Sequence, residues 1–265
     1  MKKSGFLRSP GFTVAAMIAV TLFSKVLGLL RQMMTASIFA ASPEGIAFTA
    51  ASGIPLAVFD MLFSTAVLGS FLPIYKGKLT SDPKEAESFS SSFLSAVGLV
   101  TGIVALLGIV FARPILLFAA PDLDTQTAEL AVILLRMMFP AVIFAGAAYT
   151  LVGILQSNER FLLPAFVSAL SNLVMILYLA FCPKPIERIS VFGLAAAYLV
   201  SWAVQFLTLA VPLFRQGKFP KPTKNILTCD TKLAAARSLP VMFGSWLIPM
   251  TSLIAKSFSS HYMSS

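Results

Sequence analysis

The stretch SKVLGLLRQ, residues 24–32, lies inside a long apolar run and carries two cations, Lys25 and Arg31. A cation at the centre of a membrane-spanning helix costs roughly 2.5–3.5 kcal/mol on insertion scales. On a helical wheel the polar residues of this run share one face, about 120° wide. That face consists of Thr21, Ser24, Lys25, Gly28, Arg31, Gln32 and Thr35. A polar face at this depth must contact protein or water, which predicts either a cavity wall or an ion pair that locks helices together.

The composition extends this picture to the whole chain. The 265 residues are 57% hydrophobic and 12% charged, whereas soluble domains carry about 25% charged residues. We therefore predict an all-α, polytopic transmembrane helix bundle with about seven spanning helices. Apolar windows place the spans near residues 11–39, 46–76, 88–119, 126–155, 161–182, 189–214 and 233–258. The second window is long enough to bend, and Pro55 favours a bend there.

Other classes of protein have little support in the sequence. One histidine and two cysteines are too few for a metal site, and no phosphate-binding loop or Ser/His/Asp set is present. We expect no metal, no cofactor and no enzymatic activity. Residues 11–23 could be the apolar core of a signal peptide, but apolar character continues to Ala41 and no clean cleavage site follows.

The distribution of Lys and Arg predicts the orientation. With a cytoplasmic N-terminus, thirteen of these residues fall in inside segments and four in outside segments, as the positive-inside rule requires. The same distribution explains the net charge of +9, because inside cations face anionic lipid headgroups. A nucleic-acid partner is therefore unnecessary.

Two further charges lie within the predicted spans. Asp60 and Lys25 lie at similar depths, roughly 22–24 Å along their helices, and we predict an ion pair between them. Arg31 would then remain unpaired. Arg136 enters from the outer side, where it either lines the cavity or extends toward the interface. Three cations against one anion would suit an anionic substrate, because guanidinium groups match phosphate geometry.

A short internal similarity suggests a parallel repeat. RSPGF opens the first span at Arg8, and RSLPVMFG opens the last at Arg237. A chance match is the alternative. If the repeat is real, residues 1–230 form a six-helix lobe and residues 231–265 contribute the first helix of a second lobe, which should pack loosely here.

Several stretches resemble the MurJ (MviN) lipid II flippase family of the MOP transporter superfamily. They are FSKVLGLLRQ (23–32), FLPIYKGKL (71–79), residues 134–166, the region of Asn172, and Gln205 to Pro212. The resemblance implies transport of an undecaprenyl-diphosphate-linked peptidoglycan precursor across the bacterial cytoplasmic membrane, for cell wall synthesis, by alternating access between two lobes. The substrate-binding residues would be Lys25, Arg31, Gln32, Ser24, Gly28 and Arg136.

The chain also departs from the family pattern. The family commonly has an acid where this chain has Ile46, and a basic pair where it has Phe59 and Asp60. Family members have about fourteen helices, so the chain resembles a truncated first half. The alternatives are a related polysaccharide-lipid or multidrug exporter, or a transport-inactive membrane remnant. The expected partners are membrane lipids, a lipid-linked anionic glycan, and a second lobe or a second copy of the chain.

Overall fold

The structure is a computed structural model that describes residues 10–39, 42–61, 65–181, 188–238 and 240. Regular secondary structure in these residues is entirely helical, which confirms the all-α prediction. The helices are α1 (Pro10–Phe39), α2 (Pro43–Phe59), α3 (Thr65–Ser81), α4 (Pro83–Val110), α5 (Ala112–Ala119), α6 (Thr125–Met138), α7 (Ala141–Ser157), α8 (Leu162–Ala180) and α9 (Arg188–Arg215). Residues 229–238 form one more helical stretch.

Five of the predicted spans are long and apolar enough to cross a membrane. They are Gly11–Phe39, Pro83–Val110, Thr125–Ser157, Leu162–Ala180 and Ser190–Arg215. The predicted second span consists of two shorter helices, and most of the predicted seventh span lies outside the described residues. The protein is therefore a multi-pass helical bundle, although the count of seven spans is not confirmed.

Three predicted spans are interrupted rather than continuous. The second runs as α2 through Pro55 and ends at Phe59, after which Asp60 and Met61 form a wider, π-type turn. The third bends at Phe111 between α4 and α5. The fourth breaks between α6 and α7 at Pro140, which has no amide hydrogen for the helical ladder. Sequence windows of apolar residues do not reveal such breaks, because hydropathy is unchanged across them.

Short polar side chains and prolines define where several helices begin. Ser42 accepts a hydrogen bond from the amide of Gly45, and Pro43 follows it at the first helical position. Asp82 and Pro83 start α4 in the same way, and Asp124 starts α6. Such caps satisfy amide groups that the first turn leaves without a helical partner.

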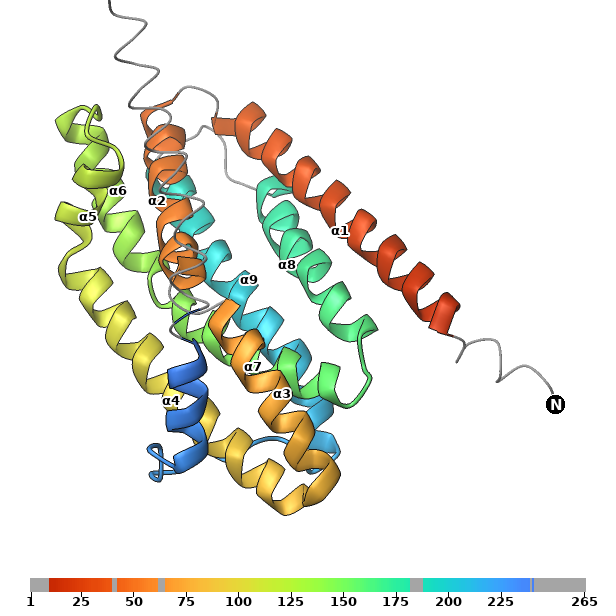
Figure 1. The fold of residues 1–265 in the computed structure, drawn as a ribbon. Coiled ribbons are helices and arrows are strands. Elements are labelled where there is room, and N and C mark those ends of the chain that lie inside the picture. The colour runs from red at the N-terminus through yellow and green to blue at the C-terminus, as the bar shows by residue number, and fades with distance from the viewer. Residues whose placement is uncertain (1–9, 40–41, 62–64, 182–187, 239, 241–265) are drawn as a thin grey trace, which may run out of the picture.

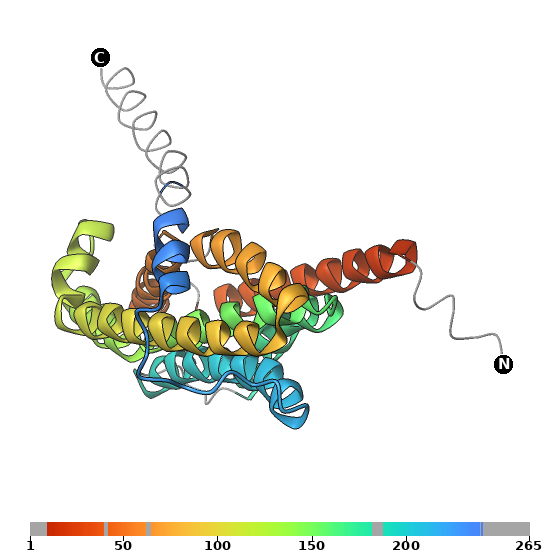
Figure 2. The same cartoon turned by 60° about the horizontal axis from the view of Figure 1, so that its bottom comes forward.

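The helices pack around two apolar clusters. One, containing Phe39, Phe59 and Phe139, joins the end of α1 to α2 and α5–α9. The other, containing Phe71 and Phe93 with ring centroids 4.8 Å apart, joins α3, α4, α7, α8 and α9. Because lipid is as apolar as these side chains, close packing rather than water exclusion holds such helices together. The long helix α1 leans away from this core and packs mainly on α8 (Figures 1 and 2).

The segment after α9 returns along the bundle and docks on it. The amides of Lys221 and Thr223 donate to Ser91 and Ser95 of α4. The stretch 229–238 then lies beside α3 and α4 (Figure 2), where the Ser238 hydroxyl donates to that of Ser70 at 2.9 Å. Most of the last predicted helix, residues 233–258, lies outside the described residues, so its loose packing stays a prediction.

Candidate substrate cavity

A cavity of about 1170 Å³ lies where α1, α2, α7, α8 and α9 meet. It is larger than the 300–1,000 Å³ typical of small-molecule sites. Its polar lining residues come from all five helices, and they are Thr21, Arg31, Gln32, Thr35, Thr49, Ser52, Asp60, Tyr149, Gln156, Ser168, Ser171, Asn172, Tyr198, Ser201, Trp202 and Gln205. The cavity can therefore offer hydrogen bonds from many directions to one ligand.

Arg31 is the cation that the structure places in this cavity. Its side chain is half-buried between α1 and the helices opposite. Asp60 and Tyr198 of α9 line the same cavity as Arg31. Gln32 and Thr35 line the cavity beside Arg31. These positions agree with the cavity interpretation of the polar face.

Ser24 and Gly28 occupy the seam between α1 and α8 instead of the cavity wall. The amide of Asn172 donates to the backbone carbonyl of Ser24 at 3.1 Å. A Cβ at position 28 would lie 3.3 Å from the same amide nitrogen. Gly28 therefore lets α1 approach the Asn172 side chain, which itself lines the cavity. The polar face of α1 thus divides into a packing part and a cavity part.

Lys25 lies outside the cavity lining and is exposed. The ion pairs found among the described residues are both made by Lys78, so the predicted pair between Lys25 and Asp60 is not formed in this conformation. The reason is the tilt of α1, which packs along α8 and touches α2 only weakly. Equal depth along two helices does not bring side chains together when the helices diverge.

Arg136 lies in a different part of the molecule. Its Nε donates to the carbonyl of Ile109 at 3.2 Å, and it lines a smaller pocket formed by α5 and α6. With Lys25 and Arg136 elsewhere, the charged residues that line the large cavity are Arg31 and Asp60. The predicted excess of positive charge is therefore absent from the described lining. One guanidinium, one carboxylate and many neutral groups make up the site.

Aromatic and amide side chains complete the cavity, and the helical wheel of α1 could not reveal them. Tyr149, Tyr198 and Trp202 contribute ring faces, and Gln156 and Gln205 contribute amides. Polar residues within apolar helices are a usable signal for such sites, and the two glutamines carry it. The aromatic residues carry no comparable signal, because their positions read as ordinary apolar surface.

The candidate membrane spans and the polar cavity between them define a multi-pass helical membrane protein. The family model for the lipid II flippase MurJ matches residues 35–265. The chain belongs to the MurJ lipid II flippase family. It is 31% identical to a probable lipid II flippase MurJ from Bdellovibrio bacteriovorus over 97% of this chain and 48% of that protein. It is 28% identical to the lipid II flippase MurJ of Burkholderia cenocepacia over 91% of this chain and 48% of that protein.

Two solved structures share the fold. A lipid II flippase MurJ in an inward closed conformation matches with a TM-score of 0.70 at 22% identity, over 84% of this chain and 46% of that one. A MOP superfamily transporter from Pyrococcus furiosus, whose binding pocket is described as reversed in polarity, matches with a TM-score of 0.61 at 18% identity, over 90% of this chain and 54% of that one. The chain spans about half the length of the curated relatives it matches.

Proposed function

We propose that this chain forms one lobe of a lipid II flippase, in which the large cavity receives the polar headgroup of the lipid-linked substrate. The observation that carries the proposal is Arg31, held within a roomy cavity between membrane-spanning helices. A guanidinium group donates paired hydrogen bonds to phosphate oxygens, and the diphosphate is the charged part of such a substrate.

The neutral part of the lining supports the same substrate class. Sugar and peptide groups need donors and acceptors, which Gln32, Gln156 and Gln205 provide, and apolar ring faces, which Trp202 provides. Arg31 and Asp60 are the charged residues of the described lining and have opposite signs, so binding depends on directed hydrogen bonds more than on net charge. A carrier of organic cations, the alternative within this superfamily, would need a carboxylate without a guanidinium beside it.

We further propose that the protein lies in the bacterial cytoplasmic membrane with its N-terminus inside. The α3–α4 turn, the α7–α8 turn and the end of α9 lie at one end of the bundle (Figure 1). These connections carry Lys78, Lys84, Arg160 and Arg215. The positive-inside rule assigns this end to the cytoplasm. Alternating access would then require a second lobe, supplied by another polypeptide segment or by a second copy of the chain.

Complementation of a flippase-depleted bacterium tests the proposal. The chain is supplied alone and then together with the second half of a related flippase. We expect growth with both halves, and loss of growth when the first half carries Arg31→Ala. Arg160→Ala, which removes the same charge from an exposed loop, is the matched control and should support growth.

The comparison of Arg31→Ala with Lys25→Ala tests the cavity assignment itself. Both positions lie on α1, but Arg31 lines the cavity and Lys25 does not. We expect the smaller loss of lipid II flipping from Lys25→Ala. Equal losses would mean that Lys25 reaches the substrate in another conformation. Full flipping by Arg31→Ala, with the protein inserted normally, would refute the proposed role of the cavity.

A further inference from the structure

A second pocket, of about 390 Å³, lies between α5 and α6 at the end of the bundle opposite the α3–α4 turn (Figure 1). It lies outside the large cavity and shares no lining residue with it. Its wall combines charged and apolar side chains from both helices and from the connection between them. The lining residues are Arg113, Leu117, Leu123, Thr125, Ala128, Glu129, Val132, Ile133 and Arg136.

The pocket carries an excess of positive charge. Arg113 comes from α5, and Glu129 and Arg136 come from α6. The ion pairs among the described residues both belong to Lys78, so Glu129 neutralises neither arginine by direct contact. Two guanidinium groups and one carboxylate leave a charge of about +1, enough for one phosphate diester.

The backbone of the neighbouring helix holds one of these arginines in place. Arg136 Nε donates to the carbonyl of Ile109, near the end of α4, at 3.2 Å. This bond uses one of the five guanidinium hydrogens, and the terminal nitrogens keep the other four. Arg136 is exposed, and the guanidinium edge that this bond leaves available is suited to bind a planar pair of phosphate oxygens.

Exposed apolar side chains lie in the charged pocket and on the helices that carry it. Leu117, which is 44% exposed, and Ile133 line the pocket, and Phe118 follows Leu117 on α5. Phe118 is 92% exposed, Phe111 52% and Ile133 47%. In a membrane protein such side chains face acyl chains. A cationic pocket beside an acyl-chain surface matches an amphiphile that has an anionic headgroup and apolar tails. A soluble anion would contact the charged side chains only and would leave these apolar side chains without a ligand contact.

We infer that the pocket between α5 and α6 binds the phosphodiester headgroup of an anionic glycerophospholipid, with Arg113 and Arg136 as its ligands. The acyl chains lie along the exposed apolar surface of α5 and α6. Glu129 opposes the anion and weakens its binding. The site is separate from the proposed substrate cavity, so its test does not depend on the transport function.

Lipid titration of the purified full chain, followed by native mass spectrometry, tests the inference. Phosphatidylglycerol is the probe, and phosphatidylcholine and inorganic phosphate are the comparison ligands. We expect phosphatidylglycerol to bind more tightly than phosphatidylcholine, and inorganic phosphate not to displace it. The variant Arg113→Gln/Arg136→Gln should weaken binding by about tenfold or more, since it removes charge-assisted hydrogen bonds.

Two single variants separate the site from general electrostatics. Arg160→Gln removes a positive charge from an exposed loop and should leave phosphatidylglycerol affinity unchanged. Glu129→Gln removes the opposing carboxylate and should tighten binding, a gain that misfolding would not produce. Equal binding of the two lipids, displacement by inorganic phosphate, or no tightening in Glu129→Gln would each overturn the inference.

Discussion

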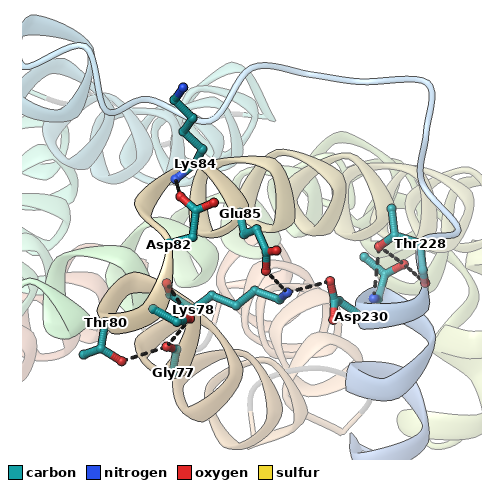
Figure 3. Close-up of polar contacts among 10 residues, drawn as sticks. Gly77, Lys78, Thr80, Asp82, Lys84, Glu85, Thr228 and Asp230 are labelled. Atoms are coloured by element: carbon teal, nitrogen blue, oxygen red, sulfur yellow. Dashed lines mark hydrogen bonds and ion pairs between the residues drawn. The ribbon is translucent and has the colours of Figure 1, made fainter.

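Replacement of Lys78 by methionine should weaken the docking of the segment 229–238 on α3 and α4. Lys78 lies near the end of α3, outside the candidate membrane spans. Its Nζ contacts Glu85 Oε2 of α4 at 2.9 Å and Asp230 Oδ2 at 3.1 Å. As Figure 3 shows, the ammonium group lies between the two carboxylates and joins three elements of the chain. Lys78→Met keeps most of the side-chain length and removes this charge.

The exposure of the three side chains sets the expected magnitude. The exposed fractions are 20% for Lys78, 60% for Glu85 and 36% for Asp230. Of the two pairs, Lys78–Asp230 is the one that connects the segment 229–238 to the bundle, whereas Lys78–Glu85 joins α3 to α4. A partly exposed ion pair contributes roughly 0.2–1 kcal/mol. The undocked population should therefore be roughly 1.4- to 5-fold larger in Lys78→Met.

Disulfide formation between α3 and the docked segment measures that population. The Ser70 and Ser238 hydroxyl oxygens are 2.9 Å apart, so cysteines at these positions should cross-link under mild oxidation when the native cysteines are serine. Lys78→Met should lower the rate and yield of this cross-link. Lys84→Met is the matched control, because only the backbone amide of Lys84 contacts Asp82. Unchanged cross-linking in Lys78→Met would refute the reasoning.

The pH dependence of docking follows from the same contacts. The hydrogen bonds that Lys78 donates to Glu85, the larger effect, and to Asp230 raise the pKa of Lys78 above its usual 10.5. Because the pKa of Lys78 is raised, its stabilisation of docking is fully present at pH values below the ordinary lysine pKa. This stabilisation is lost as the pH rises through the higher pKa of the docked state. With Lys78 in place, the yield of the cross-link between positions 70 and 238 should therefore not change with Lys78 protonation near neutral pH. It should decrease in strongly alkaline solution, where Lys78 loses its proton. A loss between pH 7 and 9 would contradict this assignment, provided that cysteine reactivity is corrected with the Lys78→Met variant.

Two further predictions concern helix packing and capping. Gly28→Leu should separate α1 from α8, because even a Cβ would lie 3.3 Å from the Asn172 amide. Overpacking of this kind costs roughly 1–3 kcal/mol, which thermal unfolding in detergent would detect. Gly28→Ala is the smaller change and should lower stability less. Asp124→Ala should lower the thermal stability of the start of α6, because the carboxylate accepts the Thr127 amide hydrogen at 3.0 Å. Contacts with Thr127 lower the pKa of Asp124. The stabilisation of α6 by Asp124 is therefore present above the usual pKa of 3.8 and is lost as the pH falls through the lower pKa of the folded state. Hydrogen exchange at the Thr127 amide measures the cap, and an exchange rate that Asp124→Ala leaves unchanged would exclude it.

The sequence was informative wherever one helix decides the outcome. The polar face of α1 identified Arg31, Gln32 and Thr35 as cavity residues, since a period of 3.6 residues fixes which side chains share a helix face. It did not separate these from Ser24 and Gly28, which share that face. Their different roles depend on Asn172, which lies far along the chain on α8.

Distances between helices were less predictable. Similar depth predicted an ion pair between Asp60 and Lys25, but Asp60 lines the cavity and Lys25 lies outside it. Depth along a helix follows from residue number, whereas the separation of two helices follows from their tilt and from the side chains packed between them. Arg136 shows the same limit, because α6 carries it to a second pocket.

The amino-acid sequence by itself determined that this protein is an all-helical membrane bundle, that its cations concentrate at one end, and that α1 has a polar face. Each of these depends on local composition and helical periodicity. Only the tertiary structure decided that Pro140 and the turn at Asp60 interrupt the predicted spans, that Arg31 and Asp60 line one cavity, and that Lys78 joins three elements. These features depend on which helices meet, and close packing among many side chains sets that arrangement.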